Sequence, residues 1–333
     1  MRSVDVVVPC YRYGHFLRQC VESILTQSGV EVRVLVLDDA SPDHTPEVGE
    51  ALAREDSRVT FHRHADNKGH IATYNEGIEW ASQDYFLLLS ADDYLLPGAL
   101  ERATLVMESE PDIGFSFGNA FLLHEDGELV PMDPMRRLTQ TTKHRTMKGS
   151  EFIALSGAAN IVPTATAVVR TSLQKQVGGY RPELPHSGDM EMWFRLAAHG
   201  SVGFVNAHQA VYRLHRSNMS QGYMSNVFPD LQQRKAAIDC FFENDGSSLP
   251  DSDKLRQHVD RSFGQAAIKR ASTAFNEGML DLSDQIRTYA LSTCPDIKYS
   301  WPWMKLAGKR ALGARGWNAL RSVQHAISRQ SGI

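Results

Sequence analysis

Cysteine is scarce in this 333-residue sequence, and its four cysteines are scattered. Cys10, Cys20, Cys240 and Cys294 form no C-x-x-C pair, and no histidine lies at the spacing of a zinc site. We therefore expect reduced thiols and a cytosolic protein.

Long apolar runs and an excess of positive charge are also lacking. No stretch approaches the roughly 18–20 apolar residues that span a bilayer, and Met1-Arg2-Ser3 leads into an apolar strand rather than into a signal sequence. The net charge of −4 argues against a nucleic-acid partner, which requires a basic patch. With 333 residues, of which 42% are hydrophobic, the chain is long enough for one large domain or two ordinary ones, each with its own core.

Short apolar segments alternate with helical patterns in the first hundred residues. Strands are expected at 4–8, 31–37, 58–62 and 86–89, with helices between them. This alternation predicts an α/β fold with a mostly parallel sheet. In such sheets ligands bind at the carboxyl ends of the strands. Polar side chains follow each of these ends: Tyr11, then Asp38 and Asp39, then Asn67 to Gly69, then Asp92 and Asp93.

The adjacent carboxylates Asp92 and Asp93 follow the apolar run Phe86–Leu89. Two like charges raise each other's proton affinity, so the pair requires a cation or solvent. A divalent ion shared with a substrate phosphate would meet that requirement. The alternative is a solvated turn before the helix that begins near Pro97.

The rest of the chain divides near residue 226. A polar stretch over 125–148 is typical of a lid or binding loop. Extended segments are expected at 162–170, 202–205 and 211–215, and a helix from Ser187-Gly188-Asp189 to Gly200. Helical patterns dominate after 226, at 231–242, 255–275 and 282–293. We predict one domain over 1–225 and a helical region over 226–333.

The last 37 residues contain basic and aromatic residues but no acidic one. Such a segment resembles an amphipathic helix that rests on an anionic membrane surface. The alternative is a helix that packs on the domain and exposes a solvated basic face. The basic residues are Lys298, Lys305, Lys309, Arg310, Arg315, Arg321 and Arg329, and the apolar ones include Trp301, Trp303, Leu306, Leu312, Trp317 and Leu320.

The strand-end residues fit the needs of a nucleotide-diphosphate sugar. Tyr11 can stack on a base, and Asp39 can accept a hydrogen bond from a ring imide or amide. Asp92, with or without Asp93, can hold Mg²⁺ or Mn²⁺ between two phosphates. Each has a plainer interpretation, Tyr11 as an exposed rim residue and Asp39 as a helix cap.

Three further residues, which lie in the second half of the chain, extend this hypothesis. His215 could add a nitrogen ligand to the metal, and Arg213 could contact phosphate. Asp189 is the best candidate base for an acceptor hydroxyl, because a helix amino end favours the ionised carboxylate. The plainer interpretations are a surface histidine and a capping aspartate.

Six segments, in order and spacing, resemble the inverting family 2 glycosyltransferases of the nucleotide-diphospho-sugar transferase (GT-A type) fold. The resemblance covers about residues 4–220. The segments are VVVPCYRYGHFLRQCVESILTQ, VLVLDDASPD, DNKGHIATYNEGI, LLLSADDYLLPGALE, GDMEMWFRLAAHG and YRLHRSNMS.

The resemblance implies roles for individual residues. Asp189 would be the catalytic base and Glu191 a supporting acid. The metal, Mn²⁺ or Mg²⁺, would be held by Asp92, Asp93 and His215, with Arg213 on phosphate. The nucleotide-binding residues would be Pro9, Tyr11, Asp39, Asn67, Gly69 and Ala91, and Asn75 matches a polar position that follows them.

One position departs from the family pattern. Ser90 stands where the D-x-D motif has its first aspartate, so the metal site lacks one acidic group while Asp92 keeps the main role. A non-catalytic nucleotide-binding or scaffold protein stays an alternative. A nucleotidyltransferase is another, although the segment after the first strand lacks the glycine-rich loop that cradles a triphosphate.

The resemblance also implies partners and a place in the cell. The donor would be a nucleotide-diphosphate sugar, with a UDP-sugar the first expectation. The acceptor would be a saccharide or lipid-linked hydroxyl in surface polysaccharide (O-antigen or capsule) biosynthesis. We expect a cytoplasmic protein at the inner face of the membrane, contacting it through 297–333.

Overall fold

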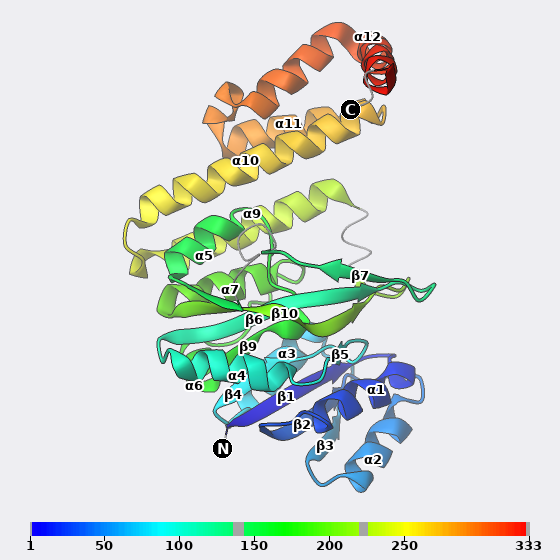
Figure 1. Ribbon diagram of the computed structural model, residues 1–333, viewed down its shortest axis with the longest axis vertical. Helices are drawn as coiled ribbons and strands as arrows, with labels where there is room; N and C mark the ends of the chain where they lie inside the picture. The colour runs from blue at the N-terminus through cyan, green and yellow to red at the C-terminus, as the bar shows by residue number, and fades with distance from the viewer. Residues whose placement is uncertain (1, 136–142, 220–225, 331–333) are drawn as a thin grey trace.

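The computed structural model describes residues 2–135, 143–219 and 226–330, and the side chains of all of these except 314, 315 and 318–330. A single mixed sheet forms the lower part of the molecule as drawn in Figure 1, and helices are stacked above it in successive layers. The predicted α/β class with its largely parallel sheet and helical carboxyl-terminal region is confirmed.

The first half of the sheet is parallel, in the order β3-β2-β1-β4. Its strands form where short β-branched runs alternate with helices, as the sequence predicts. In β1, Val4, Val6 and Val8 pack into one apolar cluster and Val7 into the other, so both faces of the sheet are covered. The elements are β1 (Ser3–Cys10), α1 (Gly14–Leu25), β2 (Glu31–Asp38), α2 (Thr45–Glu55), β3 (Val59–Arg63), α3 (His70–Trp80) and β4 (Tyr85–Leu88).

The second half of the sheet is mixed. Its centre is a parallel pair of long strands, β6 (Ile113–Leu123) and β10 (Ser201–Arg213). The two extended segments expected at 202–205 and 211–215 belong to this one strand, because irregularities in register around His208 break its apolar pattern. The remaining strands pair antiparallel: β5 (Tyr94–Leu95), β7 (Leu129–Met132), β8 (His144–Met147) and β9 (Val168–Arg170).

The predicted lid over 125–148 is partly ordered structure. Strand β7 pairs with β6 and β8 with β10, at the margins of the sheet. Residues 136–142 of the predicted lid lie outside the described residues. The segment expected to be extended over 162–170 contains a 3₁₀ turn, η1 (Thr164–Thr166), before β9.

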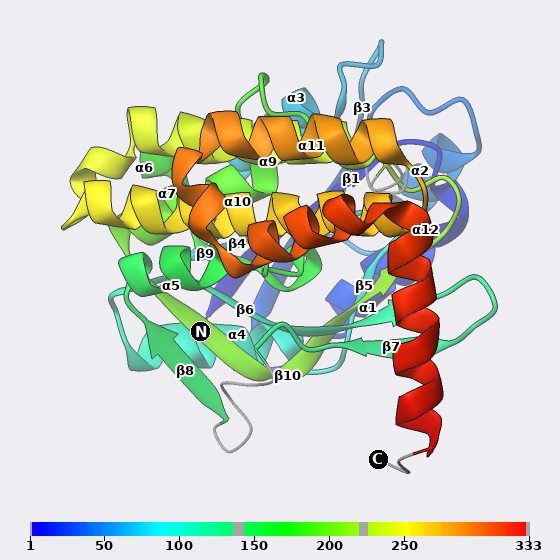
Figure 2. The same cartoon turned by 90° about the horizontal axis from the view of Figure 1, so that it is seen from above.

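Helices cover both faces of the sheet and then continue beyond it. The helices from α9 onward form the upper layers in Figure 1, and Figure 2 shows α12 lying over α10. The predicted helices at 231–242, 255–275 and 282–293 are confirmed as α9, α10 and α11. The helical elements after β5 are α4 (Ala99–Ser109), α5 (Gly149–Ser156), α6 (Thr171–Val177), α7 (Gly188–His199), α9 (Val227–Asn244), η2 (Gly246–Ser248), α10 (Ser252–Asn276), α11 (Leu280–Thr293), η3 (Pro295–Tyr299) and α12 (Trp301–Gln330).

The apolar core continues from the sheet into the helical layers. One cluster of buried side chains includes strand residues, α7 and the helices α9 to α11. Phe194 of α7 and Phe241 of α9 are both buried, and their rings meet edge to face at 5.5 Å. The division into two domains near 226 stays a prediction, since this core crosses it.

Among the described residues, no helix has the length and apolar character needed to cross a bilayer.

Replacing Phe241 with alanine tests the shared core. The change removes a fully buried ring, and we expect it to lower the free energy of unfolding by about 3–5 kcal/mol. Denaturant unfolding followed by both circular dichroism and tryptophan fluorescence measures the loss. The control Leu105→Ala truncates a side chain that is 48% exposed, and its effect should stay within about 0.5 kcal/mol. A first transition at low denaturant that appears in circular dichroism but not in tryptophan fluorescence would contradict a shared core.

Candidate functional site

A cavity of about 700 Å³ opens at the carboxyl ends of β1, β2 and β4. Its wall brings together six of the residues predicted from sequence, which are separated by up to about two hundred positions. These are Pro9, Tyr11, Asp39, Asn67, Gly69 and His215. The convergence follows from parallel pairing, because strands that run the same way end at one edge of the sheet.

Asp39 is held rigidly on this wall. Its Oδ1 accepts the backbone N–H of Lys68 at 2.7 Å, and its Oδ2 accepts that of Gly69 at 2.9 Å. Asn67 donates its Nδ2 to the Asp39 backbone oxygen at 3.1 Å. Gly69 has φ +82°, a backbone conformation that strongly favours glycine. His44 occupies the N-cap position of α2, so Asp39 does not cap that helix.

A buried histidine supports Asp39 from behind. His64 is 3% exposed, with Nδ1 2.8 Å from Asp39 Oδ1 and Nε2 3.0 Å from Glu76 Oε2. Lys68 Nζ lies 2.9 Å from the same Glu76 oxygen. Sequence reasoning missed His64; its position directly after the third strand was the available signal. The chain Glu76–His64–Asp39 fixes the orientation of the carboxylate.

Asp92 and His215, 123 positions apart, are in contact. Asp92 Oδ2 lies 3.0 Å from His215 Nε2 and accepts Asn218 Nδ2 at 3.0 Å. The hydroxyl of Ser90 donates to the other oxygen, Oδ1. Ser90, which stands where the D-x-D motif has its first aspartate, therefore bonds directly to Asp92.

Asp93 points elsewhere. Its Oδ1 accepts the backbone N–H of Arg213 at 3.0 Å. Burial, with the neighbouring Asp92 charge as a smaller cause, raises the pKa of Asp93 well above its ordinary value. A carboxyl group that favours its protonated form is a poor cation ligand, so a metal role for Asp93 stays a prediction.

The donor set at Asp92 and His215 fits a divalent cation. One carboxylate oxygen and one imidazole nitrogen lie side by side, and Mn²⁺ accepts both kinds of ligand. The only group of three closely spaced ligating side chains within the described residues lies elsewhere, at His62, His64 and Glu76. A cation at Asp92 would thus take its remaining ligands from substrate or water.

Asp189 lies behind the cavity wall, in the first turn of α7. Thr164 donates its hydroxyl to Asp189 Oδ2 at 2.9 Å, and the hydroxyl of Tyr180 also bonds to this carboxylate. The Tyr180 ring contacts Tyr74, which lines the cavity, at 5.4 Å. The N-cap of the helix is Ser187, so Asp189 is not the cap.

Burial raises the pKa of Asp189, although the hydrogen bonds from Thr164 and Tyr180 lower it in part. Loss of hydration thus acts against the helix amino end, which was expected to favour the ionised carboxylate, and the role of Asp189 as base stays a prediction. A raised pKa makes the carboxylate a stronger base once it is ionised.

Two other predicted contacts are placed off the wall. The Arg213 guanidinium stacks on the rings of Phe16 at 4.7 Å and Tyr94 at 5.1 Å. Ala91 is fully buried and donates its N–H to the Pro9 oxygen. Two arginines that sequence reasoning missed, Arg12 and Arg216, line the cavity instead.

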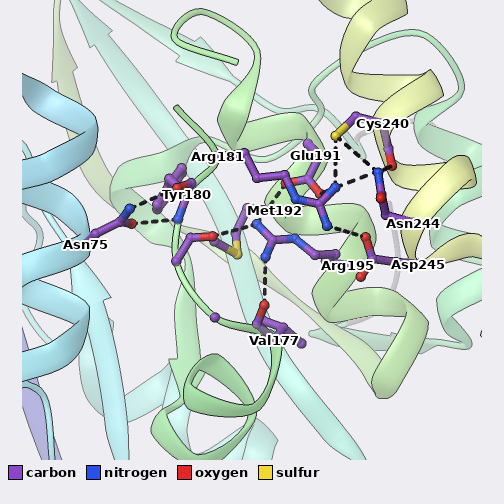
Figure 3. Close-up of polar contacts among 12 residues, drawn as sticks. Asn75, Val177, Tyr180, Arg181, Glu191, Met192, Arg195, Cys240, Asn244 and Asp245 are labelled. Carbon is purple, nitrogen blue, oxygen red and sulfur yellow. Dashed lines mark hydrogen bonds and ion pairs between the residues drawn. The ribbon is translucent and has the colours of Figure 1, made fainter. Parts of the chain in front are cut away.

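Glu191 belongs to a buried ion-pair cluster with Arg181 and Arg195 (Figure 3) and does not line the cavity. It is fully buried, 2.8 Å from Arg195 Nη2 and 3.1 Å from Arg181 Nη1. Arg181 continues to Asp245, beyond the end of α9, at 2.6 Å. The cluster therefore ties α7 to the helical region, and its ion pairs favour a structural role for Glu191, while support of the base stays a prediction.

Asn75, on the other side of Figure 3, anchors the segment that carries Tyr180. Its Oδ1 accepts the Tyr180 N–H at 2.6 Å, and its Nδ2 donates to the Tyr180 oxygen at 2.9 Å. Asn75 thus holds the backbone of Tyr180, the residue whose hydroxyl bonds to Asp189.

Glu191→Gln separates a structural from a chemical role. Removing the buried charge leaves Arg195 without its counter-ion and Arg181 with Asp245 alone, so we expect a loss of about 3 kcal/mol in the free energy of unfolding. Denaturant titration measures it, and the exposed Glu183→Gln is the matched control. Unchanged stability together with lost activity would place Glu191 in the chemistry.

The sequence of this chain is similar to those of known glycosyltransferases. Residues 5–161 match the model of "Glycosyl transferase family 2". The chain is 23% identical over 263 residues to EpsH of Bacillus subtilis, covering 77% of this chain and 72% of that protein. It is 31% identical over 130 residues to the GalNAc(5)-diNAcBac-PP-undecaprenol beta-1,3-glucosyltransferase of Campylobacter jejuni, covering 39% and 41%.

A solved structure shares the fold along nearly the whole chain. The crystal structure of an S. aureus TarS fragment in complex with UDP-GlcNAc superposes with a TM-score of 0.64 at 16% identity, covering 99% of this chain and 92% of that one. The likeness extends through the helical layers as well as the sheet. The segment 5–161, just under half of the chain, is thus a glycosyl transferase family 2 segment, and the whole chain shares its fold with the TarS fragment.

Proposed function

We propose that this glycosyltransferase moves a sugar from a UDP-sugar to a hydroxyl of a saccharide or lipid-linked acceptor, with inversion. The observation that carries the proposal is the pairing of two fixed groups at one cavity. Asp39 is clamped by two backbone N–H groups, and Asp92 meets His215 at a neighbouring strand end. A base-binding acid and a diphosphate-metal site are the two parts that such a donor requires.

The nucleotide end of the donor fits the Asp39 side of the cavity. A uracil ring presents an imide N–H, which a carboxylate can accept. Tyr11, 42% exposed on the wall, offers a ring face for stacking. The TarS fragment, which shares the fold, was crystallised with UDP-GlcNAc and with UDP, and this favours a UDP-sugar as donor.

The diphosphate fits the opposite side. Asp92 and His215 would hold Mn²⁺ or Mg²⁺, which neutralises charge on the departing nucleotide diphosphate. Arg12 and Arg216 line the same cavity and supply further positive charge for phosphate oxygens.

Asp189 is the proposed base. Its carboxylate takes the proton from the acceptor hydroxyl as that oxygen bonds to the anomeric carbon, while the bond from this carbon to the phosphate oxygen breaks. A single displacement of this kind inverts the anomeric centre. Thr164 and Tyr180 hold the carboxylate by hydrogen bonds from two sides, so its direction is set before the acceptor binds.

The acceptor and pathway rest on the relatives. The Campylobacter jejuni relative is named for glucosyl transfer to an undecaprenol-linked saccharide. We propose a comparable role in surface polysaccharide biosynthesis, on a saccharide or lipid-linked acceptor at the inner face of the membrane.

Donor screening with Asp189→Asn tests the function. Thermal shift with UDP, GDP, dTDP and CMP sugars, with and without Mn²⁺, should single out the UDP series, since binding raises stability by mass action. Asp189→Asn should keep nucleotide binding and lose about 10²–10⁴-fold in transfer. Equal inactivity of wild type and Asp189→Asn across the panel would favour a non-catalytic nucleotide-binding protein. Release of pyrophosphate from a triphosphate would favour a nucleotidyltransferase.

The pH dependence of transfer tests the environment of Asp189. The base must be ionised, so kcat/KM should fall as pH drops through its pKa, and the raised pKa places this acid limb above the ordinary range of aspartate. Thr164→Val removes a hydrogen bond that lowers this pKa, so the limb should move upward by about one pH unit. The matched control is Thr60→Val, on the exposed part of β3. An acid limb that stays in place in Thr164→Val would remove Asp189 from the role of base.

A further inference from the structure

The outermost helical layer carries an exposed apolar strip. Tyr299 and Trp301 are each 73% exposed, Met304 is 50% and Leu312 is 55%. They lie on η3 and the first half of α12, which belongs to the helical layer farthest from the sheet in Figure 1. Trp301, Met304 and Leu312 follow helical spacing and share one face of α12.

The opposite face of the same helix is used for packing. Leu306 is 1% exposed and belongs to the main core, and Lys309 is 4% exposed, with Nζ donating to Ser272 and Asn276. Arg310 pairs with Asp284 of α11 at 2.7 Å. The first half of the helix thus packs on the protein and leaves an apolar outer face, while membrane contact stays a prediction. The side chains of Arg315, Leu320, Arg321 and Arg329 lie outside the described residues.

Two lysines accompany the apolar strip. Lys298 precedes Tyr299, with its Nζ 4.9 Å from the centre of that ring, and the exposed Lys305 follows Met304. Neither lysine forms an ion pair with a side chain in the described part of the chain. No acidic residue occurs from 297 onward. The strip thus combines interfacial aromatics with uncompensated positive charge.

We propose that this outer face, made of Lys298, Tyr299, Trp301, Met304 and Lys305, docks on an anionic lipid surface. Tryptophan and tyrosine suit the boundary between headgroups and acyl chains, and lysines gain from negative headgroups within a Debye length. An anionic lipid surface complements the strip in two ways: its negative headgroups attract the lysines, and its acyl chains accept the apolar rings. The proposal does not depend on sugar transfer, so it can hold or fail independently of the proposed function.

Vesicle flotation of the full chain tests the surface. Wild type should float with vesicles of phosphatidylcholine and phosphatidylglycerol at low salt, and much less with phosphatidylcholine alone or at high salt. The variant W301A/M304A should bind about tenfold more weakly or worse. The variant K298E/K305E should lose about 30-fold, from about 1 kcal/mol for each lysine removed.

The matched control is L105A/L129A, which truncates two side chains of 48% and 50% exposure on α4 and β7. It should float like wild type, and circular dichroism should show all variants folded. Equal flotation of wild type on both vesicles, or unchanged flotation of W301A/M304A, would overturn the proposal. A wild-type dimer in light scattering that W301A/M304A converts to monomer would reassign the strip to contact with a second copy.

Discussion

The structure depends on one constraint: four neighbouring parallel strands run in the same direction, so their carboxyl ends share one edge. Tyr11, Asp39 and the Asn67–Gly69 turn lie at that edge. Ser90 and Asp92 lie there as well, beside the carboxyl end of β10, which His215 follows. The backbone N–H groups of Lys68 and Gly69 then set the direction of the Asp39 carboxylate. A preorganised acceptor of this kind recognises a base without first rearranging.

Sequence patterns predicted the strand-end residues because the hydrophobic periodicity locates the strands, and their alternation with helices places the strand ends at that edge. They failed for side chains whose direction depends on tertiary packing. Glu191 is two positions from Asp189 on a helix, and residues two apart do not face the same way. Asp189 therefore meets Thr164 and Tyr180, whereas Glu191 enters the ion-pair cluster. The guanidinium of Arg213 stacks on Phe16 and Tyr94, and no local pattern records these contacts, so its phosphate role stays a prediction.

The helical region takes part in the architecture of the site. Arg181 joins Glu191 of α7 to Asp245, just beyond α9, and Asn75 holds the neighbouring Tyr180 backbone. Through Tyr180 this framework reaches Asp189. Sequence composition correctly indicated where helices begin to dominate, yet the shared apolar core and these polar links could be found only from long-range contacts.

We propose that one cavity holds a nucleotide diphosphate between Asp39 and Asp92. The most direct measurement is a crystal structure of the chain with UDP and Mn²⁺. We expect the uracil imide on the Asp39 carboxylate beside Tyr11, and the metal on Asp92 and His215 with the diphosphate. A nucleotide bound elsewhere, or one in this cavity that leaves Asp39 and the Asp92–His215 contact untouched, would contradict it.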